Sequence, residues 1–325
     1  AVQWLDAEGL PYDARDPARY PTYTTDVQKS MLEEVRAIYN DVLLDGAPFA
    51  NLYSSSYTFA NQALINFYGL SGSAGSAVQK VNTTNRGGLL ASGAFTARNA
   101  HFAKTAPVIR AVRTRRSFLC HDVPNPPTGV ALDQLREDQA KAFEALKATQ
   151  GGFATARQEY HFLTSVSPCT NCHLKIINPL GFGFEDFSPV GLPRTRDDNN
   201  LSVAFQDDDG TLYGINSLDD GKSLAFAGTK DLGAKLVASP DGLSQLRSCF
   251  VENNFRLAFG TGIKYFDRNL VGSDDKPIPL PAAQQQANAN EVAALIQQMS
   301  ANSNSPKAML QSLGSLKSVR YRKDF

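Results

Sequence analysis

The 325-residue sequence has no net charge and no long apolar run. Its 32 basic residues balance 32 acidic ones, so no overall field favours nucleic acid or an anionic membrane surface as a partner. No stretch approaches the roughly 18 apolar residues needed to cross a bilayer, and we therefore expect no integral membrane segment. Gly and Pro number 24 and 17, too few for a collagen-like or disordered chain. A folded globular protein is the class that remains.

The start of the chain also lacks the features of a signal peptide. Residues 1–4 (AVQW) have neither a charged start nor an apolar stretch. Because the first residue is Ala1 and not Met, we expect that a presequence or a longer N-terminal part was removed. The sequence likewise contains no P-loop, no G-x-S-x-G motif and no dinucleotide-binding fingerprint.

The spacing of apolar residues predicts a mainly helical protein. Val27, Met31, Val35, Ile38 and Val42 recur every three or four positions after a capping segment at 24–26, which is typical of an amphipathic helix. We predict further helices at about 58–68, from 107, and at about 133–146, 155–161, 242–259, 287–300 and 306–319.

The segment from 194 to 230 has a different composition, rich in Asp, Asn and Gly. The alternation over 212–215 predicts a small β-hairpin inserted among the helices. Residues 207–210 (DDDG) resemble part of a calcium-binding loop but lack its terminal Glu, and a turn explains them equally well.

The most informative segment is 168–173, Pro-Cys-Thr-Asn-Cys-His, which contains the haem c attachment pattern C-x-x-C-H. Two thiols at this spacing near a helix start can bond the two vinyl groups of haem, and the adjacent His173 then lies under the iron. With only 4 Cys and 4 His in the chain, a chance occurrence is expected on the order of one time in a thousand. The pattern predicts one covalent haem c held by Cys169, Cys172 and His173.

Three other interpretations of Cys169 and Cys172 stay open. A zinc site would need two more ligands, and the sequence has no second C-x-x-C or H-x-x-x-H pattern. A thioredoxin-like redox pair would follow a strand in a βαβ unit, which the helical surroundings do not suggest. A disulfide between the two cysteines would be strained.

Cys120 and Cys249 lie outside this motif. Haem c is attached in oxidising compartments, where two spare cysteines tend to form a disulfide, so we expect a periplasmic or extracellular protein with this bridge. The bridge would close a loop of 129 residues. Because it lowers the entropy of the unfolded chain, such a cross-link is expected to stabilise the fold by roughly 4–5 kcal/mol. Two buried free thiols are the alternative.

The motif and the residues after it resemble a known family. C-x-x-C-H is followed by residues 178–187 (NPLGFGFEDF), then Val190-Gly191 and Arg194. This order is similar to a run in large secreted cytochrome-like proteins of planctomycetes, myxobacteria and some marine proteobacteria, in which tandem domains of unknown function surround a single haem motif. Residues 57–61, 67–70, 86–90, 107–116, 255–260 and 318–322 resemble other segments of that family.

The resemblance implies a cytochrome-c-like haem domain and a location outside the cytoplasm. It indicates little about the reaction. We expect a helical bundle-like domain over 1–120 and a haem-binding domain over 121–325, with the haem segment at 153–200 and C-terminal helices at 240–325. Cys120 and Cys249 coincide with cysteines of one branch of the family. Asn178 stands where the family usually has Asp, and Ala111 where it has Gly.

The ligand opposite His173 decides between a closed electron carrier and an open site for peroxide or gas. We expect His161, eight residues before Cys169, to be this distal ligand; a hydrogen bond to a haem propionate or a helix cap is its alternative role. The other candidates are His101, His121, Met31, Met299 and Met309, for which capping, surface or core positions are more typical.

Two further residues after the motif, Pro179 and Arg194, are expected to contact the haem, Arg194 through a propionate. The basic cluster Arg110, Arg113, Arg115 and Arg116 could dock an acidic redox partner or pair with propionates, although a solvated helix face is the ordinary explanation.

The sequence therefore predicts a mono-haem c-type cytochrome that transfers single electrons to or from a redox partner protein, and it favours this role over an enzymatic one without deciding between them. The alternatives are a haem enzyme or sensor with an open distal site, and a structural haem module of a larger surface assembly.

Overall fold

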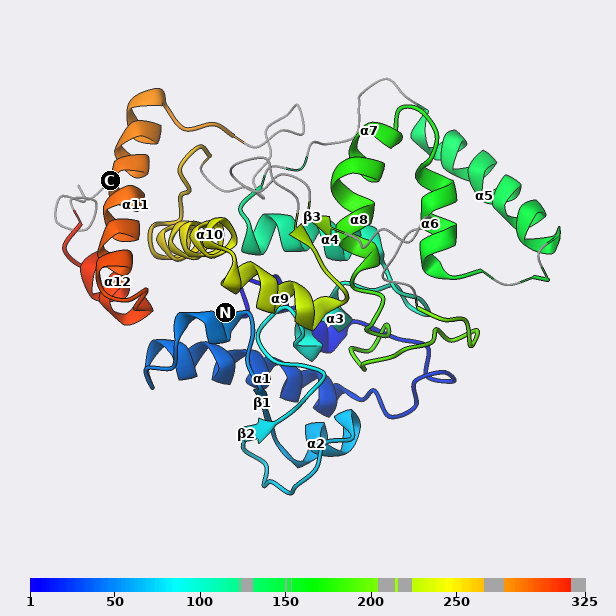
Figure 1. The fold of residues 1–325 in the computed structure, drawn as a ribbon, viewed down its shortest axis with the longest axis horizontal. Coiled ribbons are helices and arrows are strands. Elements are labelled where there is room, and N and C mark those ends of the chain that lie inside the picture. The colour runs from blue at the N-terminus through cyan, green and yellow to red at the C-terminus, as the bar shows by residue number, and fades with distance from the viewer. Residues whose placement is uncertain are drawn as a thin grey trace.

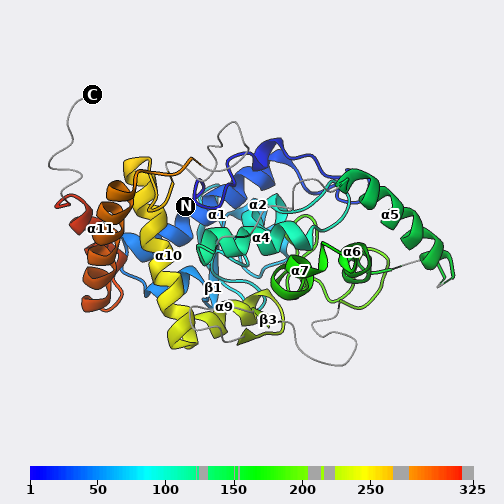
Figure 2. The same ribbon diagram turned by 90° about the horizontal axis from the view of Figure 1, so that it is seen from above.

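Helices dominate the structure, a computed structural model that describes residues 1–121, 123, 131–149, 151–152, 154–203, 214–215, 224–265 and 278–316. Helices α11 and α12 lie at one end of the molecule and α5, α6 and α7 at the other, with α4 between them (Figures 1 and 2). The possible calcium loop at 207–210 and the family-like segment at 318–322 lie outside the described residues. No described helix is long and apolar enough to span a bilayer.

The elements follow one another in this order. The helices are α1 (Thr25–Leu43), α2 (Gln62–Tyr68), α3 (Gly93–Arg98), α4 (Pro107–Phe118), α5 (Leu132–Thr149), α6 (Ala156–Thr164), α7 (Thr170–Cys172), α8 (Asn178–Phe182), α9 (Thr229–Ala238), α10 (Pro240–Phe259), α11 (Ala282–Ala301) and α12 (Pro306–Leu313). Short turns form η1 (Leu10–Tyr12), η2 (Phe49–Leu52) and a π-helical η3 (His173–Ile177). Strands β1 (Tyr57–Ala60) and β2 (Gln79–Asn82) form one antiparallel pair, and β3 (Gly214–Ile215) and β4 (Leu224–Ala225) another.

Helix α1 confirms the prediction made from its apolar spacing. The Thr24 side chain accepts a hydrogen bond from the Val27 N–H and so begins the helix. The buried Glu34 of the same helix accepts bonds from the hydroxyls of Thr58 and Tyr68 and from the Gly93 N–H. A single carboxylate thus holds β1, α2 and α3 around α1.

The helix predicted over 58–68 is wrong in its first part. Residues 57–60 form β1 because they pair with Gln79–Asn82, and the aromatic and β-branched residues there suit a strand. The Asn61 side chain caps the N–H of Leu64, so the helix begins at Gln62, and it ends at Gly69 in the left-handed conformation. Helices α3 and α9 were not predicted, whereas the small hairpin β3–β4 and the mainly helical class are confirmed.

The predicted division at 120/121 does not separate two cores. One hydrophobic core contains buried residues from Val2 to Met309 on both sides of that point. Trp4 joins them: its ring lies 5.5 Å from that of Phe118 and 5.7 Å from that of Phe250, and its Nε1–H donates to Ser117 O. Residues 1–120 and the C-terminal helices therefore fold as one packed unit.

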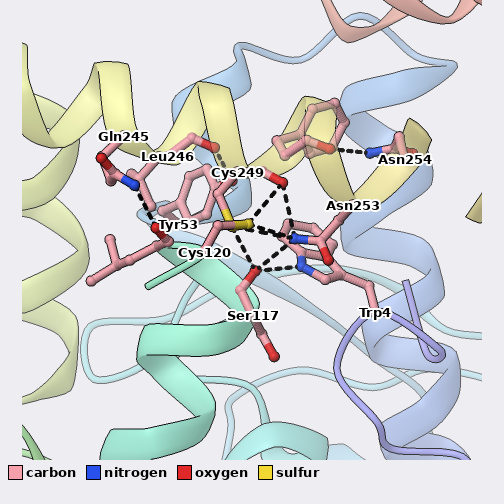
Figure 3. The surroundings of a disulfide bond; sticks show 11 residues. Trp4, Tyr53, Ser117, Cys120, Gln245, Leu246, Cys249, Asn253 and Asn254 are labelled. Carbon is pink, nitrogen blue, oxygen red and sulfur yellow. Dashed lines mark hydrogen bonds between the residues drawn. A yellow bond between two sulfur atoms is a disulfide. The ribbon is translucent and has the colours of Figure 1, made fainter. Parts of the chain in front are cut away.

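The predicted disulfide between Cys120 and Cys249 is present, with the two Cα atoms 5.2 Å apart. It joins the end of α4 to the middle of α10, where the Asn253 side chain donates to the carbonyl oxygens of Cys249 and Ser117 (Figure 3). The bridge closes a loop of 129 residues, and so it restricts the unfolded chain strongly.

We expect the double variant Cys120→Ser/Cys249→Ser to lose ~2–5 kcal/mol of unfolding free energy, because its unfolded chain gains the freedom that the bridge removes. Urea unfolding without reductant measures the change. Reductant should destabilise the wild type to a similar extent and leave the variant unchanged. Equal stability of wild type and variant would contradict a stabilising role for the bridge.

A cavity beside the C-x-x-C-H segment

The C-x-x-C-H segment lines a cavity of about 660 Å³. This volume lies within the roughly 300–1,000 Å³ that is typical of ligand sites. The walls are mainly apolar and come from α4, α5, α6 and the motif itself. The lining residues are His101, Val108, Ile109, Val112, Arg116, Val123, Leu135, Arg136, Ala140, Tyr160, Leu163, Thr164, Pro168, Cys169, Cys172, His173 and Ile177.

Local structure brings both thiols to this cavity. The His173 N–H donates to the Cys169 carbonyl oxygen at 3.0 Å, which turns the chain through α7. Cys169 and Cys172 are half-buried free thiols. They are therefore not joined in a disulfide, and that interpretation of the motif is wrong.

Among the described residues, no group of three or more His, Cys, Asp and Glu side chains is arranged to hold a metal ion. Within that part of the chain, the two thiols lack the additional ligands that a structural zinc site requires.

The orientation of His173 follows from a chain of hydrogen bonds. The Asn178 amide nitrogen donates to the Thr164 hydroxyl at 2.8 Å, so the amide oxygen faces His173 Nδ1 at 3.2 Å. Nδ1 must then carry the proton, which leaves the lone pair on Nε2. Burial lowers the pKa of His173, and the bond to Asn178 acts in the opposite direction. A neutral imidazole with its Nδ1 held in this way is the form that ligates metals.

Three of the predicted site residues lie off the cavity lining. The Arg194 side chain donates to the Glu185 carboxylate and to the Glu185 carbonyl oxygen, both at 2.9 Å, so its charge is paired inside the protein rather than presented to a ligand. Pro179 lies in the first turn of α8, where it suits a helix start. His161 is exposed on α6, and the described lining includes its neighbour Tyr160 instead.

The predicted basic cluster on α4 is not a single surface patch. Arg110 is fully buried and donates to four backbone carbonyl oxygens. Arg113 pairs with Asp6 at 2.6 Å, and Arg115 donates to the carbonyl oxygen of Ile176. Only Arg116 of the four lines the cavity, because α4 turns successive side chains to different neighbours.

Sequence reasoning did not assign Tyr160 and Arg136 to the site, and it named His101 only as one of the less favoured candidates for the distal ligand. His101 Nε2 and the Tyr160 hydroxyl are 3.0 Å apart, and both residues line the cavity. Arg136 projects from α5 and makes a long ion pair with Asp133, 3.7 Å between the charged atoms. No sequence signal connects these residues to the motif, since they approach it only through the packing of α4, α5 and α6.

The residues that follow the motif support it structurally. A Cβ atom added at Gly181 would lie 2.3 Å from the carbonyl oxygen of Pro107, and one at Gly183 would lie 2.1 Å from the ring of Phe226. Glycine is therefore required where α8 crosses α4 and where the next turn meets the chain after β4. The segment 181–187 fixes the packing behind the cavity rather than lining it.

Comparisons with known families match two parts of the chain. Residues 86–197 match the family described as PSCyt3, a protein of unknown function (DUF1588), and residues 1–70 match PSD4, a protein of unknown function (DUF1592). Tandem domains of unknown function of this kind are typical of the family that the sequence resembles. The first match contains the C-x-x-C-H segment, α4, α6 and α8. No curated protein and no solved structure matches the chain.

Behind the cavity, Asp186 gives the structure a specific pH dependence. Its two carboxylate oxygens accept bonds from the N–H and the hydroxyl of Thr229, at 2.8 and 2.6 Å. Burial nevertheless raises the pKa of Asp186 from 3.8 to about 6. Because the pKa is higher in the folded protein, the stability that this group contributes is full below about pH 4 and is lost as the pH rises through about 6.

We expect the wild type to lose ~1–3 kcal/mol of unfolding free energy relative to Asp186→Asn between pH 4 and pH 7, since the variant has no charge to bury there. Denaturant unfolding at a series of pH values measures the difference. The exposed Asp133→Asn is the control and should parallel the wild type. A pH-independent difference for Asp186→Asn would contradict the prediction.

Proposed function

We propose that the protein is a c-type cytochrome that binds one haem covalently and transfers single electrons. The observation that carries the proposal is the meeting of Cys169, Cys172 and His173 at one apolar cavity. The C-x-x-C-H spacing alone is also compatible with a zinc site or a redox pair. Neither of these sites requires an apolar space of about 660 Å³ beside the thiols.

The cavity suits haem in chemistry as well as in size. Haem has a flat apolar ring and two propionates, and the lining combines aliphatic walls with a small number of polar groups. Arg116 and Arg136 lie on this lining, where guanidinium groups would pair with carboxylates. These two residues take the role that the sequence suggested for Arg194.

The free thiols support attachment without any oxidant. Each thiol would add across one vinyl double bond of the haem, with its sulfur bonding to one carbon and its hydrogen going to the other. His173 would provide its Nε2 to the iron, with Nδ1 held by Asn178. When bound, the iron supplies one-electron redox chemistry, and the chain supplies the ligand, the apolar surroundings and the charges that set the potential.

The disulfide supports a compartment outside the cytoplasm. Disulfides such as Cys120–Cys249 persist in oxidising compartments, which are also where haem c is attached. We therefore propose a periplasmic or extracellular location and a redox partner protein there.

A haem sensor or enzyme with an open distal site is the competing function, and the position of the expected distal ligand His161 off the cavity lining favours it. Carbon monoxide distinguishes the two functions, because it binds reduced haem only where a coordination position is open.

Expression with the c-type maturation machinery tests the proposal directly. We expect haem absorbance that stays with the polypeptide after denaturation, and its loss in Cys169→Ala/Cys172→Ala, because that variant has no thiol to form a thioether bond. Thr170→Ala changes the same turn and should retain the haem. A protein without covalent haem under these conditions, and above all one that holds zinc instead, would overturn the proposal.

A second test uses the bond between His173 and Asn178. Replacing Asn178 by Asp gives Nδ1 an anionic acceptor, which makes the imidazole a stronger donor to the iron and favours the oxidised state. We expect the reduction potential to fall on the order of 60 mV, a tenfold change for one electron. Asn171→Asp adds the same charge at the exposed position inside the motif.

Redox titration of both variants separates the hydrogen bond from the charge, and the fall should be larger for Asn178→Asp. Equal shifts would show that Asn178 does not tune the iron through His173.

A further inference from the structure

The function of the proposed haem depends on whether a side chain binds the iron on the face opposite His173, and the structure shows which candidate ligands lie at the cavity. A strong axial ligand is a side chain at the cavity that offers a nitrogen or sulfur lone pair, in practice His or Met. The sequence contains four His and three Met, and all seven lie among the described residues. Each of them can therefore be located relative to the cavity.

Most of these residues lie away from it. His161, which is exposed as His101 is, lies off the lining, and His121 faces the Arg115 guanidinium, which lies 3.0 Å from His121 Nδ1. The three methionines are fully buried in the hydrophobic core, Met31 on α1, Met299 on α11 and Met309 on α12. Helices α11 and α12 lie at the opposite end of the molecule from α7 (Figures 1 and 2).

His101 is the one that joins His173 at the cavity. It lies in a short loop before α4, which is closed by a bridge between Ala100 and Thr105 and by the bond from the His101 N–H to Lys104 O. The Lys104 ammonium pairs with Glu159 at 2.6 Å, which fastens this loop to α6. The backbone that carries His101 is thus held against one wall of the cavity.

The ring nitrogen Nε2 of His101 is the atom that could bind the iron. Nε2 lies 3.0 Å from the Tyr160 hydroxyl, and both residues line the cavity. In a neutral imidazole one ring nitrogen carries the lone pair that a metal needs.

We propose that His101 is the second axial ligand, so that the haem iron lies between two histidines, residues 101 and 173. This inference rests on the proposed haem c. Tyr160 is then a positioning residue, whose hydroxyl group holds His101 Nε2 at the cavity before the iron binds it. Two imidazoles close the iron to external ligands and give a lower potential than a His–Met pair, because a thioether ligand favours the reduced state.

The test is a set of spectra on the full-length protein with its covalent haem. We expect the wild type to be low-spin and unaffected by carbon monoxide when reduced. His101→Ala should become high-spin and bind carbon monoxide, and added imidazole should restore the low-spin spectrum. His161→Ala is the matched control and should behave as the wild type.

His101→Met provides a second readout that does not depend on losing a ligand. We expect it to remain six-coordinate with a potential higher than that of the wild type, which a merely structural role for His101 would not produce. This variant also covers the case in which His101→Ala fails to fold.

The outcomes separate the two proposals. A wild type without covalent haem overturns both. A wild type with covalent haem that is high-spin, or a His101→Ala protein that stays low-spin, overturns the assignment of His101 and leaves the cytochrome standing. If His161→Ala loses the low-spin spectrum instead, the distal ligand is His161, and α6 must turn in the loaded protein.

Discussion

The buried guanidinium of Arg110 is the constraint on which the rest of the structure depends. It donates to the carbonyl oxygens of Thr96, Phe184, Phe187 and Ser188, at 2.7 to 2.9 Å, and so joins α3 and α4 to the turn after α8. Burying a cation is costly, and these four bonds satisfy its two terminal nitrogens, whereas its Nε has no hydrogen-bond partner among the described residues. Burial lowers the pKa of Arg110 to about 10, still high enough to keep the charge at neutral pH. Because α8 begins at Asn178, this anchor also determines where Asn178 meets His173.

The cavity is lined in part by α4, the helix that Arg110 anchors. Helices α4, α5 and α6 turn aliphatic side chains toward a common space that they do not fill themselves. Apolar walls facing water cost free energy in proportion to their area, so a ligand that covers them contributes stability of its own. The proposed haem would act as the core of this end of the molecule, as Trp4 and its aromatic neighbours do at the centre.

Sequence spacing predicted local structure, whereas contacts that depend on distant packing could not be predicted from it. The cap of α1 involves residues within one turn and is confirmed. Cys169, Cys172 and His173 are equally close in sequence and line one cavity. Arg194 and His161 were chosen because they are near the motif in sequence. Arg194 pairs with Glu185, and α6 turns His161 outward while Tyr160 lines the cavity. His101 is 72 positions before His173, and nothing in a single sequence reports that α6 brings the two together.

The disulfide and the proposed iron would be two cross-links of the same kind. Cys120 follows α4 and is bonded to α10, while His101 precedes α4 and would be joined through iron to the segment after α7. Each link closes a long stretch of chain, and one lies at each end of α4, the helix that Arg110 anchors in between. Forming the disulfide requires no cofactor, so it can order one end of α4 before haem is attached. The other end would then be secured only in the loaded protein, which makes the cavity the part of the fold that haem completes.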